Sequence, residues 1–87
     1  MHKLDLHGAN RYEAKVLVES FLYESYCTKQ YFVCIVHGHG DYIIKNEVWD
    51  ALSASPYVER YEFAPPQFGG AGATIVYIDQ GAGRDQS

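Results

Sequence analysis

The sequence predicts a two-layer α/β sandwich with the element order βαβαββ. Two apolar runs, at residues 3–7 and 31–36, each lead into a His-Gly pair and then into apolar residues at helical spacing. Two strand–helix units in series imply parallel strands, because a parallel return needs a crossover connection. Right-handed crossovers place both helices on one face of the sheet. We therefore expect a four-stranded mixed sheet whose second face is at least partly open.

The first unit combines an alternating strand with a capped helix. In residues 3–7 the leucines face one side, whereas Asp5 and His7 face the other. Asn10, followed by Glu13 three residues later, predicts a helix N-cap close to a capping box. The helix extends to about Tyr26, with a buried stripe of Ala14, Leu17, Val18, Phe21 and Leu22.

The second unit begins with an unbroken β-branched and aromatic run, typical of a central strand covered on much of both faces. Gly38 and Gly40 permit a tight turn, after which Asp41 is expected to cap the second helix. That helix ends before Pro56, because the residue before a proline disfavours helix. Its apolar stripe consists of Ile44, Val48, Ala51 and Leu52.

The remaining chain predicts two more strands, at residues 58–63 and 74–78, with a connection short enough to join antiparallel neighbours. Residues 79–87 are small and polar without an apolar anchor, so we expect them to fray. One domain over residues 1–79 and a flexible tail over residues 80–87 are therefore predicted.

Composition restricts the classes of function. The 87 residues are 47% hydrophobic, enough for a core, and the formal charge of −4 disfavours strong non-specific phosphate binding. The chain has no run long enough to span a membrane and no signal sequence, so we expect a soluble, cytoplasmic protein without a membrane partner. Cys27 and Cys34 lack a metal-ligand spacing, and we expect both to be buried and reduced.

The two His-Gly pairs should meet at one rim of the sheet, because parallel strands end at the same edge, where ligands bind in open α/β sheets. His7 and His37 can divide the acid and base roles, since imidazole titrates near pH ~6.5. Asp5 can orient an imidazole or hold a divalent cation that activates water. In the alternative reading, Asp5 and His7 only stabilise the turn through bonds to backbone.

The turn that follows His37 offers backbone N–H groups and the positive end of a helix dipole to a phosphate. His39 adds a cation when protonated, or is an exposed loop residue; Lys45 reaches a phosphate, or is solvated. The stretch that starts with Gly69 and Gly70 either curls toward the site or only supplies positive φ angles. Tyr12, Trp49 and Phe68 are core-edge residues or stacking platforms, with packing favoured for Trp49.

Four ordered blocks resemble the Smr (small MutS-related) domain family. They are LDLHG at 4–8, VHGHG at 36–40, VERYEFAPP at 58–66 and GGAGATIVYI at 69–78. The resemblance implies a fold similar to the C-terminal domain of translation initiation factor three. It also implies nucleic-acid binding and, as in several members, nicking of DNA or cleavage of RNA.

By position, the resemblance assigns Asp5, His7 and His37 to the catalytic motifs, together with Gly38 and Gly40. Many members carry lysine, glycine and arginine where this chain has His39, Tyr42 and Lys45. A neutral imidazole does not replace an ammonium at pH 7, whereas a tyrosine offers a stacking face for a base. The expected substrate-binding residues are Gly38, His39, Gly40, Tyr42, Lys45, Gly69 and Gly70, and the expected cofactor, if any, is Mg²⁺ or Mn²⁺ with Asp5 as ligand.

The leading prediction is a nucleic-acid-binding domain with endonuclease (phosphodiester hydrolase) activity on DNA or RNA, in DNA repair or recombination. It would be fused to, or act with, a larger MutS-like or ribosome-associated protein. One alternative, favoured by the acidic charge, is a non-catalytic module that binds nucleic acid or the ribosome. Another is a protein–protein interaction domain whose open sheet face docks a partner.

Overall fold

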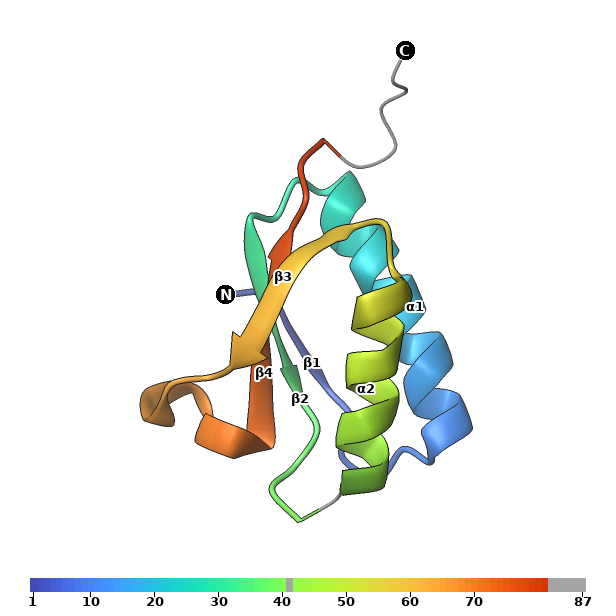
Figure 1. The fold of residues 1–87 in the computed structure, drawn as a ribbon, viewed down its shortest axis with the longest axis vertical. Coiled ribbons are helices and arrows are strands. Elements are labelled where there is room, and N and C mark those ends of the chain that lie inside the picture. The colour runs from blue at the N-terminus through green and yellow to red at the C-terminus, as the bar shows by residue number, and fades with distance from the viewer. Residues whose placement is uncertain (41, 82–87) are drawn as a thin grey trace.

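The computed structural model of the chain describes residues 1–40 and 42–81. The predicted cap at Asp41 and the tail beyond residue 81 lie outside the described residues. The structure confirms a four-stranded mixed sheet with two helices (Figure 1). The elements are β1 (Lys3–Asp5), α1 (Arg11–Cys27), β2 (Phe32–Val36), α2 (Tyr42–Ala54), β3 (Val58–Phe63), the 3₁₀ turns η1 (Pro66–Phe68) and η2 (Gly70–Gly72), and β4 (Ala73–Ile78).

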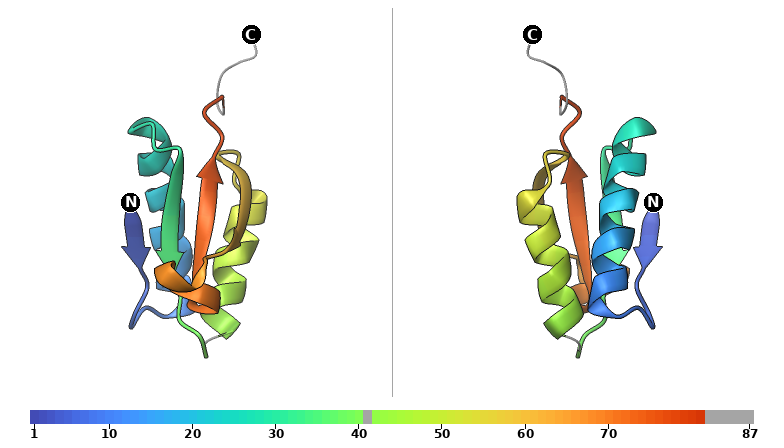
Figure 2. Two further views of the ribbon diagram at one scale, coloured as in Figure 1. Left: turned by 90° about the vertical axis from the view of Figure 1, so that its left-hand side faces the viewer. Right: turned by 90° about the vertical axis from the view of Figure 1, so that its right-hand side faces the viewer.

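The strands lie across the sheet in the order β1-β2-β4-β3. β1 pairs with β2 in parallel, with Asp5 beside Val36, and β4 runs antiparallel to both β2 and β3. Both helices cover one face, as predicted, and η1 and η2 lie over one end of the other face (Figure 2). This order places the ends of β1 and β2 and the start of β4 at the same edge.

The start of α1 is set by local sequence. The Asn10 side chain accepts a hydrogen bond from the Glu13 N–H at 2.9 Å, and the Glu13 carboxylate accepts one from the Asn10 N–H at 2.9 Å. The expected capping box is therefore present. The prediction that Leu17 belongs to the buried stripe is wrong. Leu17 is 42% exposed, because it lies at the edge of the face that packs on α2 and the sheet. Ser25, which was not predicted, is buried.

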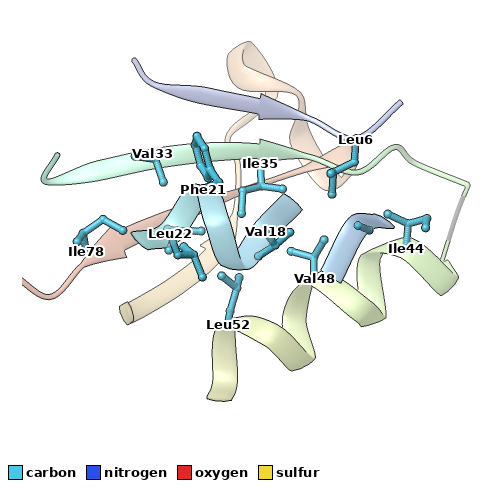
Figure 3. Packing of buried hydrophobic residues seen from close by; sticks show 12 residues of the cluster. Leu6, Val18, Phe21, Leu22, Val33, Ile35, Ile44, Val48, Leu52 and Ile78 are labelled. Carbon is cyan, nitrogen blue, oxygen red and sulfur yellow. The ribbon is translucent and has the colours of Figure 1, made fainter. Parts of the chain in front are cut away.

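The main core lies between the helices and the sheet (Figure 3). It joins Val18 and Leu22 of α1 and Val48 and Leu52 of α2 to alternating residues of the central strands. Those strand residues are Val33, Ile35, Val76 and Ile78.

A smaller cluster on the opposite face contains Cys34, Ala64, Ala73 and Ile75. Phe32 on that face remains exposed, so the second face is partly open, as predicted.

Three further expectations are resolved by the structure. Cys34 is buried, but Cys27 is exposed, because it is the last residue of α1 and lies beyond the core; both thiols are free. Fraying does not begin at Asp79, whose N–H donates to the Tyr57 carbonyl at 2.8 Å, and Gln80 donates to the Gln30 carbonyl at 2.6 Å. Neither helix in the described ranges is long and apolar enough to cross a bilayer.

Candidate functional site

The two His-Gly loops line one cleft of about 700 Å³ at the carboxyl ends of β1 and β2. The first loop contributes Asp5 and His7, and the second contributes His37, Gly38 and Gly40. The parallel pairing brings the loops together, since Leu6 still donates its N–H to the Val36 carbonyl at 2.9 Å before the chains diverge. Segments some thirty positions apart in the sequence therefore share one site.

Asp5 and His7 form a short turn at the exposed side of this cleft. Both side chains are exposed, and the Asp5 Oδ1 accepts a hydrogen bond from the His7 backbone N–H at 2.9 Å. This bond is the turn-stabilising role that the sequence left open. A carboxylate has roughly four acceptor sites, so the same group can also accept a substrate proton or coordinate a cation.

His37 has different surroundings from His7. Its side chain is only 6% exposed, and its Nε2 lies 2.8 Å from the Thr74 Oγ1. Its Nδ1 lies 3.2 Å from the Gly38 carbonyl, which can only accept, so in the neutral ring we assign the proton to Nδ1. The Thr74 hydroxyl then donates to Nε2, and it accepts from the Trp49 indole N–H at 2.9 Å. Both ring nitrogens of His37 are thus engaged within the protein.

The electrostatic surroundings keep His37 neutral. Burial lowers the pKa of His37; the bond to the Gly38 carbonyl opposes this change, and the positive charges of Lys45 and His39 lower the pKa further. Its catalytic assignment stays a prediction. The geometry favours a role in holding the second His-Gly loop, residues 37–40, which we call the Gly38 loop. A buried neutral ring with two partners is poorly placed to exchange protons with a substrate.

The glycine-rich segment before β4 does curl back to the site. The Gly72 carbonyl accepts hydrogen bonds from the N–H groups of His37 at 3.0 Å and Gly38 at 2.8 Å. These two N–H groups, expected to bind an anion, are therefore already used. Gly69 and Gly70 adopt positive φ angles of 116° and 56°, so the segment also supplies the turn geometry that glycine permits.

Sequence reasoning missed Thr74 as part of the site, and it placed Gly72 only within the glycine-rich stretch that could curl toward the site, without a role of its own. The signal for Gly72 is the stretch Gly69-Gly70-Ala71-Gly72 before the last strand, whereas nothing local marks Thr74 as a histidine partner. Gly72 has a second role, because an added Cβ would lie 2.7 Å from Nδ1 of the exposed His39. The absence of a side chain there lets the His39 ring lie against the backbone.

The cation and the aromatic residues near this loop are arranged around Trp49. The Lys45 Nζ lies 4.3 Å from the centroid of the Trp49 ring and 5.7 Å from that of Phe63, so Lys45 is not simply solvated. Trp49 packs against the main core, as favoured from the sequence. Tyr12 and Phe68 are exposed, so neither is a core residue.

The described residues contain no group of three His, Cys, Asp or Glu side chains that could jointly hold a metal ion. Asp5 is exposed at the cleft and remains the candidate ligand for a divalent cation.

The fold and the cleft define a small α/β domain with its site at the ends of two parallel strands. Over residues 4–79 the chain matches the Smr domain, and it belongs to this family. The likeness to translation initiation factor three stays a prediction.

Two relatives show the range of proteins that carry such a domain. The chain is 41% identical over 76 residues to endonuclease MutS2 of Carboxydothermus hydrogenoformans, which covers 87% of this chain and 10% of that protein. It is 39% identical over 80 residues to ribosome rescue factor SmrB of Shewanella baltica, which covers 90% of this chain and 44% of that protein. The chain thus spans less than half the length of either relative.

Two solved structures share the fold. The Smr domain of Thermus thermophilus MutS2 superimposes with a TM-score of 0.87 at 29% identity, over 91% of this chain and 99% of that one. YdaL, a stand-alone small MutS-related protein from Escherichia coli, superimposes with a TM-score of 0.84 at 28% identity, over 87% of this chain and 63% of that one.

Proposed function

We propose that this domain binds nucleic acid at the cleft between the two His-Gly loops and cleaves a phosphodiester bond there. The observation that carries the proposal is the convergence of the exposed Asp5 and His7 with the Gly38 loop on one cleft of about 700 Å³. Two relatives, an endonuclease and a ribosome rescue factor, agree with a nucleic-acid substrate. We expect a cytoplasmic role in or beside a larger MutS-like or ribosome-associated protein.

The chemistry would divide between the two loops. His7 is exposed, so its imidazole can take a proton from an attacking hydroxyl or give one to a leaving oxygen. Asp5 fixes the His7 backbone through its bond to the N–H, and it is the group that could hold a divalent cation. His37 keeps the second loop in place. Phosphate contacts would then come from side chains such as Lys45, because Gly72 already uses the His37 and Gly38 N–H groups.

A cleavage assay tests this proposal. Wild-type protein should nick a supercoiled plasmid or cut a single-stranded RNA, and parallel reactions with a chelator show whether a metal ion takes part. His7→Ala should lower the rate about 100-fold or more, in line with the loss of a general acid or base. His2→Gln is the matched control, because His2 stacks on Phe21 at 4.8 Å, away from the cleft. Equal rates for wild type and His7→Ala would exclude the catalytic role.

A second candidate function is a binding module without catalysis. It is favoured by the bonds that occupy Asp5 and His37 within the protein and by the formal charge of −4. Salt-dependent binding of oligonucleotides without cleavage would support it. If a protein partner on the open sheet face were the main ligand, its capture in a pull-down would survive nuclease treatment.

A further inference from the structure

A second cavity, of about 330 Å³, lies beside the first and shares Gly38 with it. Its volume lies at the lower end of the ~300–1,000 Å³ typical of small-ligand sites. We call it the aromatic cleft. It is lined by Gly38, His39, Tyr42, Lys45, Phe63 and Ala71.

Two aromatic side chains that line this cleft are exposed to solvent. Tyr42, at the start of α2, is 71% exposed, and Phe63, at the end of β3, is 45% exposed. The Phe63 ring packs on Trp49 with ring centroids 5.0 Å apart, and its centroid lies 6.5 Å from that of His37. These contacts hold the Phe63 ring in place, so a flat apolar surface is present before any ligand binds.

A permanent cation lies directly beside this surface. The Lys45 Nζ is 5.7 Å from the Phe63 ring centroid and 4.3 Å from that of Trp49. The His39 ring, on the loop after β2, lies against Gly72 and is a second basic group in the lining of the same cleft. Aromatic faces next to a cation suit a nucleobase together with its phosphate, because the base stacks while the phosphate meets the charge.

We propose that the aromatic cleft binds an unpaired nucleobase of a single-stranded segment, with the phosphate of that nucleotide beside Lys45. This step rests on the proposed function, because both cavities would bind one strand. A duplex stacks its bases against each other, and extracting one costs a few kcal/mol, so the aromatic cleft selects single strands. It does so for DNA and RNA alike, since every base has a π-face.

Binding of short oligonucleotides tests this proposal independently of cleavage. The probes are a labelled thymidine hexamer and an abasic hexamer with the same number of phosphates, measured by fluorescence anisotropy at low salt. Trp49 is the single tryptophan of the chain and lies against Lys45 and Phe63, so its fluorescence reports occupancy of the aromatic cleft. Wild type should bind the thymidine hexamer about 5- to 100-fold more tightly than the abasic one, as expected for one stacked base.

The variants separate the base contact from the charge. Tyr42→Ala and Phe63→Leu should lose most of the preference for the thymidine hexamer and keep the affinity for the abasic one. Lys45→Gln should weaken both. Tyr31→Ala is the matched control, because Tyr31 is 74% exposed at the opposite end of β2, and it should behave as wild type. Circular dichroism should show that Phe63→Leu is folded before its binding is compared.

The outcomes distinguish this inference from the proposed function. Equal wild-type affinity for the two hexamers, or a preference that survives in both Tyr42→Ala and Phe63→Leu, overturns the aromatic cleft while leaving cleavage at His7 intact. A base preference in a protein that cleaves nothing supports the cleft and removes only the nuclease proposal. A failure to bind either hexamer at low salt overturns both.

Discussion

The Nε2 of His37 and the hydroxyl of Thr74 lie 2.8 Å apart, although 37 positions separate them in the sequence. The Trp49 indole donates to the same hydroxyl at 2.9 Å. This chain of three side chains connects β4, α2 and the loop after β2. It therefore fixes the Gly38 backbone, which borders both cavities, relative to the sheet.

The Thr74 hydroxyl should contribute measurably to stability. In Thr74→Val the shape is retained, but the Trp49 N–H and the His37 Nε2 both lose their partner. An unsatisfied buried polar group costs about 1–3 kcal/mol, so the free energy of unfolding should fall by at least that amount in urea titrations. Thr74→Ser keeps the hydroxyl and is the matched control. A Thr74→Val protein as stable as Thr74→Ser would show that the bonds are energetically unimportant.

Stability should depend on pH through His37. Because its pKa is lowered in the folded protein, mainly by burial, the unfolded chain binds the proton more readily. The contribution of His37 to the free energy of unfolding is therefore complete above the pKa of the unfolded chain, near ~6.5, and is lost as the pH falls below that value.

Urea midpoints at about pH 7.5 and about pH 5.5 measure this effect. The wild-type midpoint should be lower at the acidic value, and His37→Gln should show a smaller decrease. His7→Gln, a change at an exposed histidine, should keep the wild-type decrease. An unchanged pH dependence in His37→Gln would contradict the assignment.

The features that could be predicted from the sequence are set by neighbouring residues or by the order of the elements. The capping box of Asn10 and Glu13 spans one turn of chain, and the two His-Gly loops are placed by the parallel pairing that the order βαβ dictates. The partners of His37 could not be predicted, because they come from α2 and β4 and depend on how the layers pack. For the same reason, the sequence grouped His7 and His37 as equivalent, although one is exposed and the other is buried.

The two histidines should affect cleavage differently. If His7 transfers a proton, His7→Ala should remove one limb of the pH–rate profile. If His37 positions the Gly38 loop, His37→Gln should lower the rate and keep that limb. Thr74→Val should resemble His37→Gln, since it breaks the same contact. A limb that disappears in His37→Gln but not in His7→Ala would reverse the two roles.

The turn between η1 and η2 should require glycine at position 69. Gly69 has a φ angle of 116°, and an added Cβ would lie 3.0 Å from the Cβ of Ala73. A side chain there adds backbone strain of about 1–3 kcal/mol, so Gly69→Ala should lower the free energy of unfolding by that amount. Because the same segment carries the Gly72 carbonyl to His37 and Gly38, binding of the abasic hexamer should weaken as well. Gly40→Ala is the control for stability, since Gly40 has no positive φ angle and open space around its Cβ position. Urea titration should show a lower free energy of unfolding for Gly69→Ala and an unchanged one for Gly40→Ala. Equal losses in the two variants would mean that the positive φ angle at position 69 is not the cause.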